Sequence, residues 1–523
     1  MTILRVQNIG QYGVLKDASV HEAPINAWTD ASNVRFLDGN AYQFYGHSEA
    51  YSSTFSVPHH VLPVVIAGVR HWIYASLTKI YGVYVDGAGS VIHTNLTRQT
   101  ASVDVNYAAT ANSWTSTVLG GIPVLNPGNK VDPPQQWDLN LANNFAALSN
   151  WPANTYCKSM RSFRNFLVAL NITKTTTDYP YMVKWSHPAD PGSVPSSWDH
   201  TDPTKDAGEF DLSSGYDHIT DGLALRDSLI IYKENSVWRM DYAGGTFIQR
   251  VQQVMGMSGA MNRNCIVEID GAHLTLTTND VVIHDGNQAY SVLDKLTRRW
   301  LFNNLDAAQA YQSFVFKNPF FNEVFICFCS VGSTIPDKAV VYNYKDKTVS
   351  MRSLPNIHHA NVGQVDSSVT GASWTANPDP WNSSQSLWNS PGIVPNTARV
   401  IMAADNSKLY LLDAAGSYAG VAPTGHLERR GLSFGSAERI KLVRSIRPRI
   451  SGAAGTTVSI KVGSQNDPYE EPTYTTKEHV IGSTVSNNFL VAGRYISIRF
   501  ETADAYAWRL DSYDIDLADK GAY

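Results

Sequence analysis

The chain has 523 residues, well beyond the size at which a single hydrophobic core stops growing, so we expect two or three domains. Charged residues make up only 17% of the chain and the formal net charge is −5, which excludes a basic footprint for gripping nucleic acid. The 36 glycines and 24 prolines favour short strands joined by tight turns.

The amino terminus and the cysteines indicate the compartment. The opening sequence, MTILRVQNIGQYGVLKD, lacks the pattern of a signal peptide, and no apolar run approaches the roughly 20 residues that span a bilayer. We therefore expect a soluble protein. The four cysteines are too few for a disulfide scaffold, and we expect buried free thiols, which suit assembly in a reducing cytoplasm: Cys157, Cys265, Cys327 and Cys329.

Alternation of apolar and polar residues with a period of two predicts short strands along most of the chain. Clear examples in chain order are His71–Ala75, Asn165–Leu170 and Ser228–Tyr232. The best helix candidate, Asn140–Leu148, is short. The pattern predicts an all-β fold.

Several of these runs come in pairs across a polar turn, which is typical of β-hairpins. The pairs are Asp227–Glu234 with Ser236–Tyr242, His273–Thr278 with Val281–Asp285, Val340–Tyr344 with Thr348–Leu354, and Arg399–Ala404 with Lys408–Asp413.

The hairpins recur at intervals of roughly 40 to 55 residues, the spacing expected of propeller blades. A propeller leaves an all-β chain with only short, protected sheet edges, and we favour it over an array of β-sandwiches. We predict a propeller over residues 61–424. The candidate blade starts are Val64, Gly120, Ser162, Gly222, Asn264, Ser313 and Arg399.

Residues 366–391 are low in complexity, with tryptophans every seven residues among Ser, Asn, Pro and Asp. The prolines argue against a helix, so we expect a long loop. Its aromatic side chains pack either on their own propeller or on a neighbouring subunit or tail protein, and we slightly favour the second. The tryptophans are Trp374, Trp381 and Trp388.

From Gly425 onward the charge rises, and the strand patterns predict a separate β domain over residues 425–523. Six arginines lie between Arg429 and Arg449, interspersed with Glu428 and Glu438. A contact between subunits or with another protein, where arginine is enriched, explains them at least as well as nucleic-acid binding. With the three tryptophans, the predicted contact residues are Arg429, Arg430, Arg444, Arg447 and Arg449.

No motif nominates a nucleophile, a cofactor site or a metal site: phosphate-binding loop, dinucleotide fingerprint, H-E-x-x-H and G-x-S-x-G are all missing. We therefore predict a protein that is not an enzyme and has no cofactor. The pairs His59–His60 and His358–His359 cannot easily form bidentate metal sites, because neighbours on a strand point to opposite faces, and we expect surface or turn histidines.

The densest carboxylate group lies in residues 198–212 and could bind Ca²⁺ or hold an acid/base pair. Its spacing does not match an EF-hand, and Pro203 and Gly208 favour a solvated acidic loop. The carboxylates are Asp199, Asp202, Asp206, Glu209 and Asp211.

Taken in order, many segments resemble the tail nozzle proteins of short-tailed bacteriophages, also called tail tubular protein B or packaged-DNA stabilisation proteins. The resemblance runs along most of the chain and is weakest over residues 366–391. The matching segments are Ile25–Gly39 with Gly46, Gly120–Asn126 with Trp137–Asp138, Tyr181–Ser186, Asp190–Pro191, Pro195–Trp198, Asp202–Thr204, Ala207–Gly208, Asp211–Leu212, Ile219, Gly222–Trp238, His426–Leu432, Val462–Gln465 and Gly493–Ser497.

The resemblance implies a homo-hexameric ring of propeller subunits in the virion tail, assembled in the host cytoplasm below the portal and its adaptor. Such rings retain packaged DNA, carry a tip, needle or fibre protein, and form the ejection channel. It also implies that Met1–His60 and Gly425–Tyr523 associate in a platform facing the adaptor. DNA should pass without specific binding, so we expect a neutral or acidic lumen.

Two other functions fit the same composition. A propeller that binds or degrades surface polysaccharide would use the acidic loop and the abundant tryptophans as a sugar site. A baseplate or fibre-docking subunit of a longer tail would differ mainly in its partners.

Overall fold

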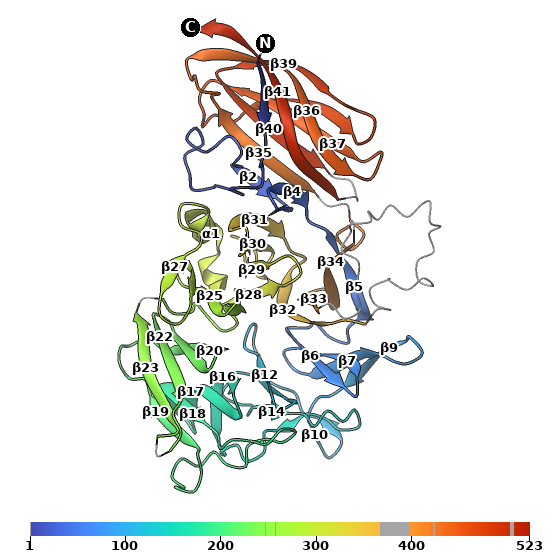
Figure 1. The fold of residues 1–523 in the computed structure, drawn as a ribbon. Coiled ribbons are helices and arrows are strands. Elements are labelled where there is room, and N and C mark those ends of the chain that lie inside the picture. The colour runs from blue at the N-terminus through green and yellow to red at the C-terminus, as the bar shows by residue number, and fades with distance from the viewer. Residues whose placement is uncertain are drawn as a thin grey trace.

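The computed structural model describes residues 2–245, 247–256, 258–366, 398–415, 417–421, 424–502 and 507–522, which fold almost entirely as β-strands (Figure 1). Within these residues, the helices are α1 (Arg298–Asn304) and the 3₁₀ helix η1 (Ala307–Gln312). No helix among them is long and apolar enough to cross a membrane. The fold class expected from the sequence is confirmed.

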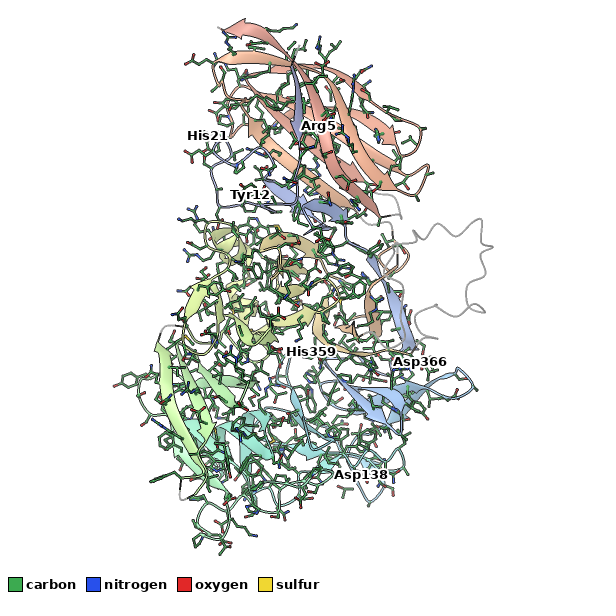
Figure 2. All side chains as sticks on the ribbon, in the orientation of Figure 1. Arg5, Tyr12, His21, Asp138, His359 and Asp366 are labelled. Carbon is green, nitrogen blue, oxygen red and sulfur yellow. The ribbon has the colours of Figure 1, made fainter. Side chains whose placement is uncertain are left out.

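The helix predicted over Asn140–Leu148 is wrong. This stretch is irregular except for the two-residue strand β15, and Phe145 stacks on the buried Trp137 at 5.8 Å between ring centroids. Trp137 Nε1 donates to the main-chain oxygens of Asn140 and Asn143. Asp138, labelled in Figure 2, accepts hydrogen bonds from the same segment, so local side-chain bonds replace the helical ones.

The described residues form seven four-stranded antiparallel blades, six as separate sheets and one as part of a ten-stranded sheet. They are β6–β9 (His60–Ile66, Val69–Ala75, Ile80–Val85, Val91–Asn95), β12–β15 (Thr115–Leu119, Ile122–Asn126, Gln135–Gln136, Ala146–Ala147), β16–β19 (Thr155–Phe163, Phe166–Lys174, Thr177–Trp185, Gly208–Asp211), β20–β23 (Ile219–Leu225, Ser228–Lys233, Ser236–Tyr242, Gln249–Gly256), β24–β27 (Ile266–Ile269, Ala272–Leu276, Val281–His284, Ala289–Ser291), β28–β31 (Phe314–Asn318, Glu323–Phe328, Lys338–Asn343, Thr348–Ser353) and β32–β34 with β5 (Ile357–Gln364, Ala398–Ala404, Lys408–Ala415, Gly46–Ser53). We number the blades 1 to 7 in this order.

The blades close into a ring around their first strands (Figure 1). Each of β12, β16, β20, β24 and β28 packs against the first strand of the next blade, and β32 packs against β6 in the same way. His60 on β6 bonds Ser116 on β12 at 2.8 Å. The outer strand of blade 7 is β5, which comes from the amino-terminal part of the chain and pairs with β34. The ring is therefore closed by a strand distant in sequence.

The four predicted hairpins all form as antiparallel pairs. Six predicted blade starts lie in, or within two residues of, the first strand of a blade. The seventh, Arg399, lies in β33, the second strand of blade 7. Its first strand, IHHANVGQ, has too many polar residues to show a strand pattern.

A β-sandwich platform packs beside the propeller and contains both ends of the chain. One layer is the sheet β2-β35-β40-β37-β38, and the other is the part of the ten-stranded sheet that holds β3, β4, β41, β36, β39 and β1. Their bounds are β1 (Thr2–Val6), β2 (Asp30–Ser32), β3 (Val34–Leu37), β4 (Asn40–Gln43), β35 (Gly425–Leu432), β36 (Arg439–Gly452), β37 (Thr457–Gln465), β38 (Thr473–Val480), β39 (Asn487–Gly493), β40 (Tyr495–Thr502) and β41 (Trp508–Ala522).

The first and last described strands lie side by side, because β1 pairs with β41. Buried residues from both ends share one core, including Trp28, Phe500 and Tyr513. The platform built from both ends is thus confirmed. The chain passes from platform to propeller near Tyr45 and not at His60, because β5 completes blade 7. A separate hairpin, β10 (Gln99–Thr100) with β11 (Val103–Asp104), projects from the rim.

Candidate functional site

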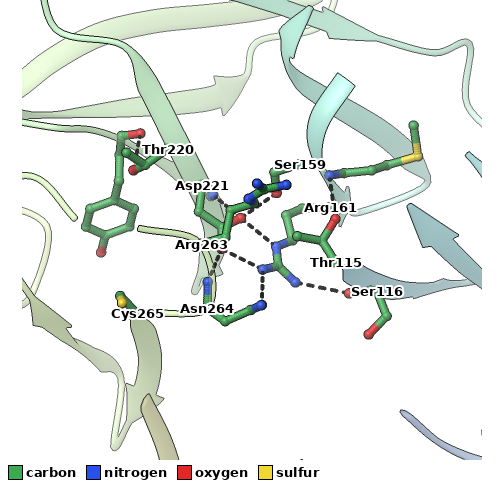
Figure 3. Close-up of polar contacts among 12 residues, drawn as sticks. Thr115, Ser116, Ser159, Arg161, Thr220, Asp221, Arg263, Asn264 and Cys265 are labelled. Atoms are coloured by element: carbon green, nitrogen blue, oxygen red, sulfur yellow. Dashed lines mark hydrogen bonds and ion pairs between the residues drawn. The ribbon is translucent and has the colours of Figure 1, made fainter. Parts of the chain in front are cut away.

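A buried salt bridge forms the hub of the propeller (Figure 3). Asp221 on β20 accepts hydrogen bonds from Ser159 Oγ at 2.5 Å and from Arg161 Nε and Nη2 at 2.8 and 2.6 Å. It also accepts from the main-chain N–H of Asn264 at 3.0 Å. Burial alone would raise the pKa of Asp221, but the charge and hydrogen bonds of Arg161 outweigh it and lower that pKa. The carboxylate is fully occupied in joining blades 3, 4 and 5.

Amide side chains connect this hydrogen-bond network to further blades. Asn264 Nδ2 donates to Asn112 Oδ1 and to the Trp114 main-chain oxygen, both at 3.1 Å. Asn112 Nδ2 in turn donates to the Tyr311 oxygen at 2.9 Å, just before blade 6. Arg263 Nη1 donates to the Ser113 oxygen at 2.8 Å. Segments of blades 2, 5 and 6 therefore meet at the hub, and their polar groups satisfy one another.

Two pairs of histidines in tilted ring contact close the seam between blades 7 and 1. His60 lies 4.0 Å from His359 and His59 lies 3.9 Å from His358, between ring centroids. Burial lowers the pKa of His359 to about 3, and that of His59 to about 3, so the rings meet as neutral imidazoles. The expectation of surface histidines is wrong for His60, His358 and His359, which are buried, whereas His59 is half-buried. Each contacts a histidine roughly 300 residues away, a separation that no local pattern reveals.

A buried ionic cluster joins the platform to the propeller. Arg35 on β3 lies 3.0 Å from Glu323 on β29 and 2.7 Å from Asp413 on β34. Arg352 on β31 pairs with the other oxygen of Asp413 at 2.7 Å, and all four side chains are at most 2% exposed. Burial alone would raise the pKa of Asp413, but the charges of both arginines outweigh burial, so the net effect is a lowered pKa. Burial raises the pKa of Glu323 to about 7.

The acidic loop of residues 198–212 uses its carboxylates within the loop or against lysines. Asp199 accepts from the N–H and hydroxyl of Thr201, and Asp202 accepts from the same groups of Thr204. Glu209 pairs with Lys184 at 3.0 Å. Thr204 and Thr201 hydrogen bonds lower the pKa values of Asp202 and Asp199. Turn formation engages Asp199 and Asp202, and ion pairing engages Glu209.

One group with metal-ligand chemistry was missed by motif analysis. Ligand atoms of Asp30, His426 and Glu428 lie within 4.8 Å of one another, although Asp30 is far from the other two in sequence. Lys16 Nζ is 2.6 Å from Asp30 and Arg499 is 3.2 Å from Glu428, so cations already occupy the carboxylates. This arrangement fits a buried ion-pair network better than a metal centre.

The predicted contact arginines differ in exposure. Arg429 is 2% exposed and donates to main-chain oxygens of its own chain, which removes it from the outer surface. Arg430 pairs with Glu428 and Glu471. On the outer face of the platform, Arg444 pairs with Asp516 and Arg449 with Asp514, while the exposed Arg447 forms no ion pair among the described residues. Trp374, Trp381 and Trp388 lie outside the described residues.

Comparisons with known proteins find only distant structural similarity. No protein-family model and no curated protein matches the chain. Virginiamycin B lyase from Staphylococcus aureus is similar over 70% of this chain and 97% of its own, at 9% identity and a TM-score of 0.39. The extracellular domain of BT4673 from B. thetaiotaomicron is similar over 92% of this chain and 61% of its own, at 8% identity and a TM-score of 0.40. The propeller assignment rests on the blade topology.

Proposed function

We propose that this chain is a structural subunit of the tail nozzle of a short-tailed phage, that it works in a homo-hexameric ring, and that it catalyses no reaction. The observation that carries the proposal is the join between platform and propeller. One sheet runs from blade 6 through the β31–β3 contact into the platform, and the Arg35 cluster locks the same junction. A continuous sheet and a buried ion cluster at the junction suit a subunit of a ring that bears pressure.

The filled propeller axis supports a second part of the proposal. Ser159, Asp221 and His60 on the inner strands are at most 2% exposed and bond to neighbouring blades. A propeller whose inner strands meet in this way has no room for duplex DNA. We therefore place the DNA channel between subunits of the ring, where DNA passes without specific binding and the chain's charge of −5 limits retention.

The expected partners are further copies of this chain, an adaptor above the ring, and a tip, needle or fibre protein below it. The Asp516–Arg444 and Asp514–Arg449 pairs place alternating charges on the outer platform face, which suits a contact between proteins. The expected location is the virion tail, after assembly in the host cytoplasm.

Light scattering on the purified chain, alone and mixed with its adaptor, tests the proposal. We expect a mass of six copies in at least one sample, and no retention of duplex DNA at physiological salt. A monomer in both samples, or tight DNA binding by the assembled ring, would contradict it.

A groove on blade 4 favours the polysaccharide alternative. It has a volume of about 520 Å³ and is lined by Tyr216, which is 97% exposed, with Asp217, Asn235 and Gln253 beside it. An exposed aromatic ring flanked by amides and a carboxylate offers the stacking surface and the hydrogen-bonding groups that bind a sugar. Binding of host surface polysaccharide that is lost in Tyr216→Ala would support this second function, and no binding would remove it.

A further inference from the structure

A pocket in the platform lies between β1, the loop of residues 19–25 and the turn that follows β35. Its volume is about 310 Å³. Leu4, Ile25, Leu432 and Phe434 give it apolar walls, and Arg429 lies among them. Figure 2 labels His21, which lines the pocket, and Arg5, the neighbour of Leu4 on β1. The pocket thus combines an apolar lining with a cation.

Arg429 has no counter-ion among the described residues. Its guanidinium donates to the main-chain oxygens of Val20, Ala23 and Arg430 and, at 3.3 Å, of Pro24. Burial lowers the pKa of Arg429 to about 10, which shows how unfavourable its surroundings are for a positive charge. A guanidinium carries five N–H donors, and these four bonds leave one donor and the whole charge for an anion.

The turn beside Arg429 presents further donors. The Ser436 N–H donates to the Ser433 oxygen at 3.1 Å, and Phe434 and Gly435 have φ angles of 49° and 86°. Within the described residues, the N–H groups of Phe434 and Gly435 have no acceptor. Consecutive unpaired N–H groups in a tight turn form an anion-binding concavity.

β1 offers a free edge next to the same pocket. Its residues Thr2–Val6 pair with β41 on one side, and no described strand pairs with the other side. Leu4, in the middle of this strand, lines the pocket. An extended peptide can add to such an edge through main-chain hydrogen bonds, with alternate side chains entering an adjacent pocket.

We propose that this pocket captures the C-terminal carboxylate of an extended partner polypeptide that adds a strand along β1. The carboxylate bonds Arg429 and the turn N–H groups, and an apolar last side chain fills the space between Leu4, Ile25 and Phe434. Glu22 lies 4.0 Å from His21 and is 75% exposed. The proposal does not depend on the nozzle function, because it rests only on the pocket, Arg429 and the free edge of β1 within the platform.

The test uses two synthetic libraries of seven-residue peptides with randomised positions, one with free C-terminal carboxyl groups and one with C-terminal amides. Affinity selection on the full chain, read by mass spectrometry, should enrich free acids that end in an apolar residue. The same sequences as amides should bind at least about tenfold more weakly, because a charge-assisted interaction is lost. Equal enrichment of both libraries, or of neither, would overturn the proposal.

Hydrogen exchange with the best free-acid peptide then locates the site. We expect protection of Thr2–Val6 and of the turn at residues 433–436. Phe434→Ala, a half-buried wall residue, should weaken binding several-fold without changing the melting temperature, whereas the matched control Leu490→Ala, 84% exposed elsewhere on the platform, should bind normally. Protection elsewhere only, or unchanged binding by Phe434→Ala, would contradict the assignment.

Discussion

The platform and the propeller hold their strands together by different chemistry. In the platform, ion pairs cross between strands, as between Arg449 and Asp514 and between Arg499 and Glu428. In the propeller, neutral imidazoles meet at the closing seam, and the hub combines carboxamide bridges with the buried Asp221–Arg161 ion pair. We therefore expect acid to destabilise the two regions at different pH values. The junction between the regions, where both kinds of contact meet, should be the most sensitive to mutation.

The largest effect is expected at that junction. Asp413→Ala leaves Arg35 and Arg352 buried with only Glu323 to oppose two positive charges. We expect it to lower the free energy of unfolding by about 3–5 kcal/mol, measured by urea denaturation. The matched control Asp514→Ala, whose arginine partners are about half exposed, should cost about 1 kcal/mol or less. Equal losses would show that the cluster does not join the two regions.

Acid should separate the two regions. Burial lowers the pKa of His359 to about 3, so between that value and the unfolded pKa of 6.5 the unfolded chain binds more protons. Propeller stability is therefore complete above pH 6.5 and falls as the pH drops toward 3, by about 1.4 kcal/mol per pH unit per histidine. Hydrogen exchange at pH 4.5 should show blade amides opening before platform amides.

The platform carboxylates also lose their stabilisation on acidification, but at lower pH. Hydrogen bonds from Arg449 lower the pKa of Asp514, so its stabilisation is present above the unfolded pKa of 3.8 and is lost only below it. Opening of β36 and β41 at pH 4.5 together with the blades would contradict this ordering. His359→Gln should flatten the response of the blades to acid.

A smaller effect is expected inside the propeller. Tyr232 on β21 bonds His273 at 2.7 Å and His284 at 2.5 Å, and His273 bonds the Ala224 oxygen at 3.0 Å. Tyr232→Phe breaks this buried chain between blades 4 and 5 and should lower the free energy of unfolding by about 1–3 kcal/mol. Tyr216→Phe, at a ring that is 97% exposed, should change nothing. A Tyr232→Phe variant of full stability would show that the chain of hydrogen bonds is dispensable.

The smallest effect on stability is expected on the outer platform face. Arg447 is exposed and forms no ion pair among the described residues, so Arg447→Glu should change the free energy of unfolding by about 0.5 kcal/mol or less. If this face contacts another protein, the same variant should weaken assembly with the adaptor in light scattering. Full assembly by Arg447→Glu would remove Arg447 from the contact.

Local patterns predicted most of the propeller and little of the sites. The Ser228–Tyr232 run and its hairpin partner follow from residues close in sequence, so β21 and β22 formed as expected. The sequence does not predict β32, because His358 and His359 are polar residues that become buried only through their contacts with His59 and His60. The sequence predicts Arg429 as a contact residue and gives no sign of its burial. Its acceptors, the oxygens of Val20 and Ala23, lie some 400 positions away in a loop that has no regular hydrophobic pattern.

The central claim is that platform and propeller form one rigid subunit of a six-fold ring. Negative-stain electron microscopy of the purified chain, alone and with its adaptor, tests it most directly. We predict six-fold rings with a central hole, in which the hole lies between subunits and each propeller is closed. Isolated single propellers in both samples would contradict the claim and shift the weight to polysaccharide binding.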